Sequence, residues 1–259
     1  MADRMPALFV GHGNPMNALL HNRYTDAWAA WGRGNQRPQA ILSISAHWHL
    51  PDLAVTATAA PRTTHDFGGF PSELSQFRYA APGNPVLAHH VQELLAPLPV
   101  RLDDRWGLDH GTWSVLSHMY PHADIPVVQL SINETQPPAF HYNLGRRLAP
   151  LRDDGVLILG SGNLIHNLHV YAWGREAVEP YDWAVRFEQR VRDLLVSGDH
   201  QSLVNYKTLG PDAMLAIPTP EHVLPLLYVL GTCQPHERVT FPVEGIDGGS
   251  ISMLAVQVG

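Results

Sequence analysis

Five histidines stand at places in the sequence where they could bind a metal ion. His12, His47 and His166 each follow a short apolar run, and His110 and His222 lie in polar turns before helix-like segments. Neutral imidazole is a ligand for zinc, iron, copper and nickel, and it exchanges protons near neutral pH. The residue types and their places therefore predict a metal site with acid–base groups beside it.

The apolar runs that precede three of these histidines predict strands buried on both faces. They are short, rich in β-branched residues and bounded by Gly, Pro or Asn. We expect strands at Ala7–Val10, Ala40–Ser45, Ala54–Thr58, Ile125–Ile132 and Val156–Gly160, with a C-terminal pair near Arg238–Val243 and Ser250–Val258.

Helical patterns lie between the strands. Apolar residues at helical spacing predict helices over Val86–Leu95, Ser114–Tyr120, Pro137–Leu148, Tyr181–Val196 and Val223–Leu230. Thr219 and Pro220 are typical of an N-cap and a first helical residue, which places Glu221 and His222 at a helix start. The alternation predicts a single α/β domain over residues 1–259, with a central mostly parallel or mixed sheet and helices on both faces.

This fold would bring the five histidines together. Ligands of open α/β sheets bind in the crevice outside the carboxyl ends of the strands, which is where His12, His47 and His166 would lie. A helix N-terminus disfavours imidazolium, so His110 and His222 would stay neutral and available to a metal. We therefore expect one metal crevice that contains all five side chains.

The remaining eleven histidines are expected to be mostly background. His49 and His169 are close in sequence to the candidate ligands, so either could hydrogen-bond to a ligand and orient it. We expect solvated side chains at His89, His90, His118, His122, His141, His200 and His236.

Composition excludes several other functions. Of 259 residues, 45% are hydrophobic and 16% are charged, which indicates a large buried core. A net charge of −7 without a basic stripe argues against nucleic-acid binding. Cys233 is the single cysteine, which excludes an internal disulfide and a multi-thiolate metal site. Lys207 is the single lysine and does not belong to a P-loop sequence.

The sequence shows no membrane or targeting signal. No run approaches the roughly 20 apolar residues of a membrane span. The N-terminal residues lack the apolar stretch of a secretory signal. We therefore expect a cytoplasmic protein with no membrane partner.

The residues alone do not identify the metal. Two histidines and a carboxylate with open positions are typical of non-haem Fe(II) oxygenases, whereas catalytic zinc sites use three protein ligands and a water. Neither H-E-x-x-H nor C-x-x-C occurs in the sequence, which disfavours the familiar zinc hydrolases and zinc fingers.

A glycine-hinged loop at Thr64–Pro71 carries an acid and two aromatic residues. One interpretation is a surface turn with a hydrophobic anchor. The other is a lid that stacks an aromatic substrate.

Six motifs carry most of these candidate residues. They are Gly11–Met16, Ser45–Trp48, His65–Pro71, Asp109–Trp113, Gly160–Asn163 with His166-Asn167, and Thr219–His222. In this order they resemble the class III extradiol ring-cleavage dioxygenases, and among these the bacterial and plant DOPA 4,5-dioxygenase branch. The resemblance runs nearly end to end, through Pro242–Gly245 and Gly249–Met253.

The resemblance implies a single α/β domain and an oxidoreductase that opens the ring of a catechol, of DOPA type, with O2. It implies a mononuclear non-haem metal, Fe(II) as expected or Zn(II) in its place in the isolated protein. His12 and His47 match metal ligands, and a third comes from Thr219–His222. Protocatechuate-cleaving relatives use a glutamate there; here His222 takes the place, with the adjacent Glu221 as the alternative.

The resemblance also implies roles for the other two histidines. His166 matches the family's acid–base histidine and, in the DOPA branch, lies within reach of the metal. His110 matches a second histidine of the substrate pocket.

Two rival functions stay open at this point. One is a non-catalytic metal-binding or signalling homologue, and the other is a zinc-dependent hydrolase on the same fold. Oxygen uptake with a catechol separates both from a dioxygenase. A substrate carboxylate would need a cation, and the sixteen arginines give no means of choosing one. The protein would be a monomer or a small homo-oligomer.

Overall fold

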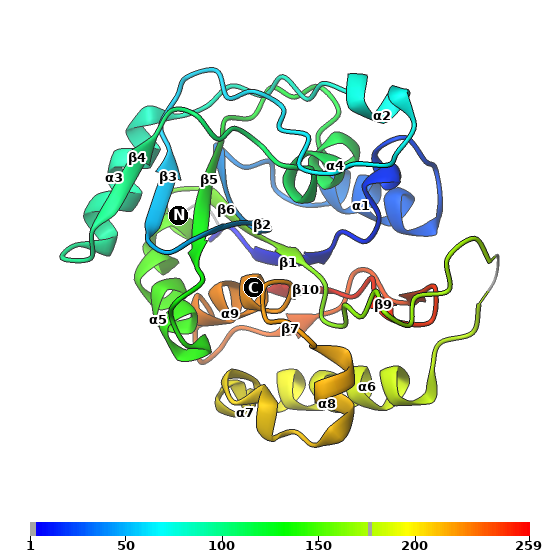
Figure 1. The fold of residues 1–259 in the computed structure, drawn as a ribbon. Coiled ribbons are helices and arrows are strands. Elements are labelled where there is room, and N and C mark those ends of the chain that lie inside the picture. Colours follow the sequence, from blue (N-terminus) through cyan, green and yellow to red (C-terminus); the bar gives the residue numbers. More distant parts are fainter. Residues whose placement is uncertain (1–3, 176–177) are drawn as a thin grey trace.

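An eight-stranded mixed sheet forms the centre of the protein (Figure 1). The computed structural model describes residues 4–175 and 178–259, so residues 1–3 and 176–177 of the predicted domain lie outside the described residues. The strands of the sheet are β1 (Ala7–Gly11), β2 (Ala40–Leu50), β3 (Leu53–Thr56), β4 (Val100–Asp103), β5 (Val127–Asn133), β6 (Val156–Gly162), β7 (Val239–Thr240) and β10 (Ala255–Val258). Their order is β4-β3-β5-β2-β6-β1-β10-β7, and β8 (Ile246–Asp247) pairs separately with β9 (Ile251–Ser252).

The middle of the sheet is parallel and its flanks are mixed. Strands β5, β2, β6 and β1 run parallel to one another. Strand β10 is antiparallel to β1 and to β7, and β3 is antiparallel to β5 but parallel to β4. Parallel neighbours need long crossover connections, so helices must cover both faces.

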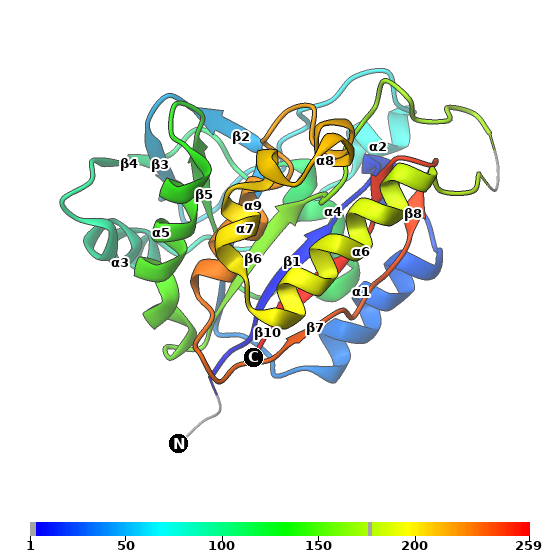
Figure 2. The same cartoon turned by 90° about the horizontal axis from the view of Figure 1, so that it is seen from below.

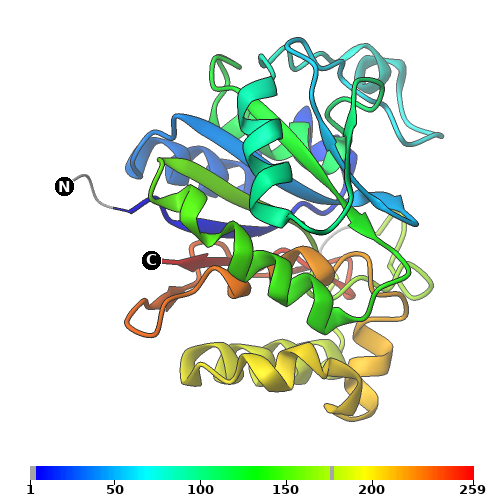
Figure 3. The ribbon, with the colours of Figure 1, turned by 90° about the vertical axis from the view of Figure 1, so that its left-hand side faces the viewer.

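Helices lie on both faces, as predicted (Figures 1, 2 and 3). They are α1 (Arg23–Gly34), α2 (Ser72–Gln76), α3 (Pro85–Leu95), α4 (His110–Met119), α5 (Pro138–Leu148), α6 (Asp182–Ser197), α7 (His200–Val204), α8 (Pro211–Ala216) and α9 (Leu224–Gly231), with short 3-10 turns η1 (Pro15–Ala18), η2 (Ala149–Arg152) and η3 (Tyr206–Thr208). Helices α1 and α4 pack on one face, and α3, α5, α6 and α9 pack on the other.

Side chains of the central strands alternate between two cores. Leu8 and Val10 of β1 join the cluster that contains Trp28 of α1. Ala7 and Phe9 of the same strand join the cluster on the opposite face. Every residue of β1, β5 and β6 is buried, which confirms that these central apolar runs are strands covered on both sides, whereas the edge strand β7 is not buried.

The predicted strands and helices form, with shifted ends. The predicted elements do not include helices α1, α2, α7 and α8 or strands β4 and β8. Helix α1 is missed because its segment has few aliphatic residues and buries Trp28 and Trp31 instead. The expected C-terminal strands are shorter than predicted: β7 has two residues, and the last run is split between β9 and β10. Among the described residues no helix is long and apolar enough to cross a membrane.

The prediction that His222 opens the last helix is wrong. Helix α9 begins at Leu224, and Pro225 takes the early proline position. Thr219 does not cap this helix, because its hydroxyl hydrogen-bonds to the carboxylate of Glu221. The N–H groups of Val223 and Leu224 both bond to the carbonyl oxygen of Pro220, so His222 lies in a turn ahead of the helix.

Candidate active site

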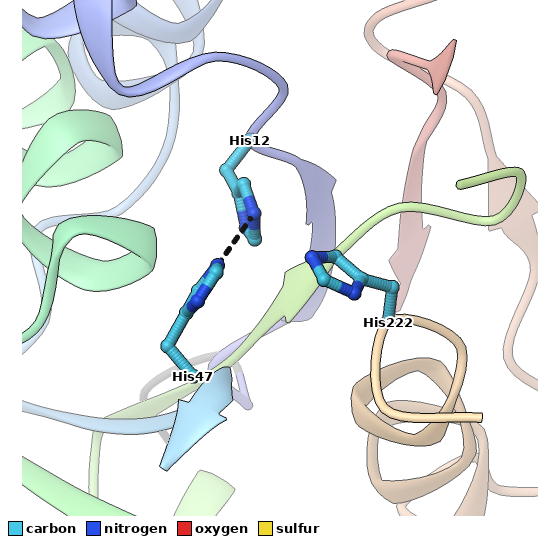
Figure 4. Close-up of side chains that lie close together, drawn as sticks. All are labelled: His12, His47 and His222. Atoms are coloured by element: carbon cyan, nitrogen blue, oxygen red, sulfur yellow. Dashed lines mark hydrogen bonds between the residues drawn. The ribbon is translucent and has the colours of Figure 1, made fainter. Parts of the chain in front are cut away.

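Three histidines from distant parts of the chain point toward one another (Figure 4). His12 follows β1, His47 lies within β2, and His222 lies in the turn before α9. One ring nitrogen of each lies within 4.8 Å of the others. The Nε2 atoms of His12 and His47 are 3.1 Å apart. The predicted convergence of these three candidate ligands is therefore present in the fold.

His47 differs from its predicted place at the end of a strand. Strand β2 continues to Leu50, and its register against β5 shifts between Ile44 and His49. An irregularity of this kind changes the direction of a side chain without ending the strand. It places His47 at the cavity rather than in the regular alternation of the sheet.

The other two predicted site histidines join the same cavity. A cavity of about 370 Å³ is lined by His12, His47, His110, His166 and His222. The rings of His166 and His222 stack, with centroids 3.5 Å apart and planes 7° apart. The ring of His110 lies 3.8 Å from that of His47. All five predicted histidines are thus brought together.

Hydrogen bonds define which nitrogen of His12 is free. The hydroxyl of Ser161 donates to the carbonyl oxygen of Gly111 at 2.5 Å. Its oxygen therefore accepts from the Nδ1–H of His12, at 2.9 Å. With the proton on Nδ1, the Nε2 atom of His12 presents a lone pair to the cluster.

Asp66 fixes two more imidazoles in the same way. Its Oδ2 lies 2.8 Å from Nδ1 of His110 and 3.3 Å from Nδ1 of His47. Its Oδ1 accepts the backbone N–H of His110 at 3.0 Å. A carboxylate accepts only, so the ring of His110 carries its proton on Nδ1 and keeps Nε2 as an acceptor. The nearby carboxylate oxygen favours the same tautomer of His47. Although burial opposes it, the hydrogen bond from His110 holds the pKa of Asp66 below its usual range.

The cluster has the properties of a metal site. Two Nε2 lone pairs face each other across 3.1 Å, which is repulsive unless a cation lies between them. Both ring nitrogens of His222 are buried and have no hydrogen-bond partner in the described chain. Metal–nitrogen bonds of about 2.1 Å would place tetrahedral ligand nitrogens about 3.4 Å apart. The residues fit a bound divalent metal.

Burial keeps these imidazoles neutral. Desolvation lowers the pKa of His12, His47 and His222 well below the usual histidine range, and the neighbouring histidines lower it further. Desolvation also lowers the pKa of His166 to about 4. Neutral imidazole is the form that binds metal.

A capped helix positions His110. Asp109 is the N-cap of α4, and its carboxylate accepts from the N–H of Thr112 and the hydroxyl of Ser45. His110 is the first residue of the helix, which begins four residues before the predicted Ser114. Complete burial raises the pKa of Asp109 to about 6.

Glu221 lies beside the cluster but outside the group formed by His12, His47 and His222. Its carboxylate is 3.5 Å from Nδ1 of His222, and it forms a second group of close ligand atoms with His166 and His222. It lines a neighbouring cavity of about 550 Å³ together with His49. His169, the other histidine predicted to support the ligands, is exposed.

The prediction of solvated side chains is wrong for His141 and holds only in part for His118 and His200. His141 is fully buried, because α5 packs it against Tyr228 of α9, whose hydroxyl lies 3.1 Å from Nδ1. His118 and His200 are half-buried rather than solvated. Amphipathic spacing does not reveal a histidine on the buried face when its partner comes from another helix.

The loop Thr64–Pro71 contributes to the cavity rather than forming a plain surface turn. Asp66, Phe67 and Phe70 line the cavity, and the two phenyl rings are 5.4 Å apart. Asp66, Tyr171 and Asp247 are lining residues that the sequence does not single out for a role. For Asp66 the only available signal is an acid inside a motif that also carries two aromatics. None of the arginines lines this cavity in the described part of the chain.

The fold and the histidine site together define a family. Residues 11–247 match the family model described as the catalytic LigB subunit of aromatic ring-opening dioxygenase. The chain belongs to this family of non-haem metal enzymes.

Relatives named for an enzymatic activity match the chain nearly end to end. A "4,5-DOPA dioxygenase extradiol" of Escherichia coli (strain K12) is 52% identical over 100% of this chain and 96% of its own length. A protein of the same description from Beta vulgaris is 39% identical over 94% of this chain and 92% of its own. The crystal structure of an uncharacterized protein from Escherichia coli K12 superposes with a TM-score of 0.87 at 48% identity, covering 99% of this chain and 100% of that one.

Proposed function

We propose that this protein is an extradiol dioxygenase that opens the ring of a DOPA-type catechol with O2. The observation that carries the proposal is the buried triad of His12, His47 and His222, whose ring nitrogens lie within 4.8 Å of one another. The activity for which these relatives are named supports DOPA as the substrate to test first. We further propose that residues 1–259 act as one catalytic domain.

The proposed metal is Fe(II), held by His12, His47 and His222. When bound, it supplies Lewis acidity toward the two catechol oxygens and redox access to O2. Zinc also accepts three imidazoles and is expected to occupy the site in protein isolated without added iron. Among the alternatives, His222 is preferred to Glu221 because it shares one group of ligand atoms with both other histidines.

The proposed acid–base residues are His166 and His110. Burial holds the pKa of His166 at about 4, so its imidazole is neutral at pH 7 and can accept a catechol proton. His110 keeps Nε2 as an acceptor because Asp66 holds its Nδ1–H. The stack of His166 on His222 also keeps His166 within reach of the metal, which supports its place among the ligand candidates.

The wall of the cavity favours an aromatic substrate. Phe67 and Phe70 stand edge to face, and Phe67 also lies 5.6 Å from the ring of His110. Their rings exclude water from one side of the cavity and offer stacking surface to a catechol. The partners implied are this small molecule and O2. A cytoplasmic location and a monomeric or small homo-oligomeric state stay predictions.

The experiment is oxygen uptake by protein reconstituted with Fe(II) under anaerobic conditions. Addition of DOPA and air is expected to consume O2 and to form a yellow ring-opened product. His12→Ala and His222→Ala should lose bound metal and activity together. His166→Ala should lose at least about 100-fold in kcat while retaining metal, because general acid–base catalysis is worth that much.

His89→Ala provides the matched control, since His89 is exposed on α3. It should leave metal content and oxygen uptake unchanged. No uptake with any of several catechols, by protein that holds stoichiometric iron, would contradict the proposal and favour a non-catalytic metal-binding protein. Loss of metal in His166→Ala would make His166 a ligand instead of an acid–base residue.

A further inference from the structure

The cavity beside the histidines has carboxylates in its wall but no cationic side chain. Asp66 and Asp247 both line it, and the described lining residues include neither Arg nor Lys. A substrate carboxylate therefore finds no basic side chain among the described lining residues. The wall is suited to a ligand that carries positive charge.

The two carboxylates differ in how many groups of the protein they contact. Asp66 accepts hydrogen bonds from the backbone and ring of His110 and lies beside the ring of His47. Asp247 accepts one side-chain hydrogen bond within the described chain, from the hydroxyl of Tyr171 at 2.8 Å. No cationic side chain of the described residues lies within 4.0 Å of Asp247. Its charge is therefore available to a ligand.

The structure holds Asp247 and Tyr171 in place. Asp247 ends β8, and the next residue, Gly248, has a φ of +52°. The ring of Tyr171 occupies the space that a Cβ at Gly248 would need. The N–H of Ala172 donates to the carbonyl oxygen of Gly248 at 3.0 Å, which ties the Tyr171 segment to the hairpin. Burial of Tyr171 and its contact with Asp247 raise the pKa of the phenol, so the hydroxyl stays a donor.

Aromatic faces accompany this carboxylate. Trp173 also lines the cavity, and its ring lies 4.7 Å from that of Tyr171 at an angle of 67°. Aromatic faces attract ammonium groups through the ring quadrupole. A free carboxylate beside two such rings is a suitable environment for an amine.

We propose that Asp247 binds the protonated amine of the substrate side chain, so that the site selects catechols that carry an ammonium group. This inference rests on the proposed catechol-cleaving function. The histidine cluster takes the catechol end, and the β8 hairpin with Tyr171 and Trp173 takes the amine. A catechol whose side chain carries only a carboxylate is disfavoured, because its charge would face Asp247 with no cation to compensate.

The test is a calorimetric titration of three catechols into the zinc-loaded protein. The ligands are dopamine, which has an amine only, 4-ethylcatechol, which is neutral, and 3-(3,4-dihydroxyphenyl)propionate, which has a carboxylate only. Wild type should bind dopamine about tenfold or more tightly than 4-ethylcatechol, the value of a charged hydrogen bond. The propionate should bind most weakly.

Variants test whether the preference for dopamine depends on the carboxylate of Asp247. Asp247→Asn should bring the ratio of the dopamine and 4-ethylcatechol Kd values close to one, and Tyr171→Phe should reduce it in part. Asp154→Asn removes one charge outside the cavity and should keep the wild-type ratio. If Asp247→Asn fails to fold, Tyr171→Phe and the wild-type ratio still decide the question.

A wild-type ratio near one, or a ratio that survives both variants, overturns the assignment of Asp247. Oxygen uptake by iron-loaded wild type with 4-ethylcatechol is measured in parallel. Uptake without amine selectivity rejects this inference and retains the proposed function. Selective binding without uptake of O2 for any catechol rejects ring cleavage and retains the ammonium site.

Discussion

At the residue scale, a single carboxylate links two imidazoles of different proposed function. Asp66 hydrogen-bonds to His110, a proposed acid–base residue, and approaches Nδ1 of His47, a proposed metal ligand. Carboxylates behind metal-bound histidines fix the tautomer and orientation of the ring. Asp66 therefore acts on the site as a positioning residue that binds neither metal nor substrate in our proposal.

Replacement of Asp66 by Asn should lower both metal affinity and kcat/KM, each by about 10- to 100-fold. An amide whose oxygen faces the two rings would present its NH2 group to the backbone N–H of His110, which Oδ1 of Asp66 now accepts. Metal content and oxygen uptake measure the two effects. Asp104→Asn, which changes an exposed carboxylate, is the control. Equal activity of the two variants would remove the positioning role from Asp66.

His141 makes the stability of the protein sensitive to acid. Burial lowers its pKa to about 4 from an ordinary value of 6.5. The unfolded chain therefore binds a proton at higher pH than the folded one, and stability falls as the pH drops from about 6.5 to about 4. Because one pKa unit corresponds to about 1.4 kcal/mol, His141 contributes up to about 3 kcal/mol to this loss.

Urea unfolding between pH 4.5 and 7.5 measures the effect. His141→Gln keeps a partner for the hydroxyl of Tyr228 and should flatten the dependence of unfolding free energy on pH. His122→Gln, at an exposed histidine, should keep the wild-type slope. A slope that is unchanged in His141→Gln would assign the acid sensitivity to other groups.

At the element scale, the end of β6 is shaped to fit the turn that carries His222. A Cβ added at Gly162 would overlap the carbonyl oxygen of His222. The N–H of Asn163 donates to that same carbonyl at 3.0 Å. A glycine at this place lets the strand and the turn approach closely, which sets the distance from His222 to the histidines on β1 and β2.

Gly162→Ala should displace the His222 turn and weaken metal binding by about tenfold. The overlap should also lower the free energy of unfolding by about 1–3 kcal/mol. Metal titration and urea unfolding test both effects. Gly34→Ala, at a helical glycine with open space around its Cβ, should cause neither loss. Normal metal affinity in Gly162→Ala would show that the turn adapts.

At the scale of the whole molecule, a buried arginine joins the two ends of the chain. Arg152 in η2 is fully buried and forms a bidentate pair with Glu237, at 2.6 and 2.8 Å. The same guanidinium donates to the carbonyl oxygens of Met5 and Val258. It thus holds the entry to β1 and the exit from β10 together, at the opposite end of β1 from His12.

Arg152→Met should lower the free energy of unfolding by about 3–5 kcal/mol, because it removes the cation that pairs with Glu237 and the donor to the carbonyl oxygens of Met5, Thr232 and Val258. Activity per folded molecule should be retained, since no cavity histidine touches Arg152. Arg186→Met breaks an exposed pair with Asp212 and should have a much smaller effect. Comparable losses in the two variants would contradict the role given to burial.

The sequence by itself determined the central strands, most of the longer helices and the kind of chemistry at the site. Apolar runs predicted the central strands, because strands covered on both faces must be apolar along their whole length. The place of His12 after β1 followed from a glycine turn at the end of an apolar run, and that of His110 near the start of α4 followed from a polar turn ahead of a helical pattern. Each of these signals involves only a few consecutive residues and can therefore be recognised in the sequence.

Only the tertiary structure decided which side chains contact the histidines of the site. Asp66 reaches His110 across 44 residues, and Ser161 reaches His12 across 149, contacts that no local pattern encodes. The ambiguity between Glu221 and His222 narrows for the same reason, since His222 alone shares a group of ligand atoms with His12 and His47. Metal sites depend on distances of a few ångströms between remote segments, and these distances are set by how strands and helices pack, as at Gly162 against the His222 turn.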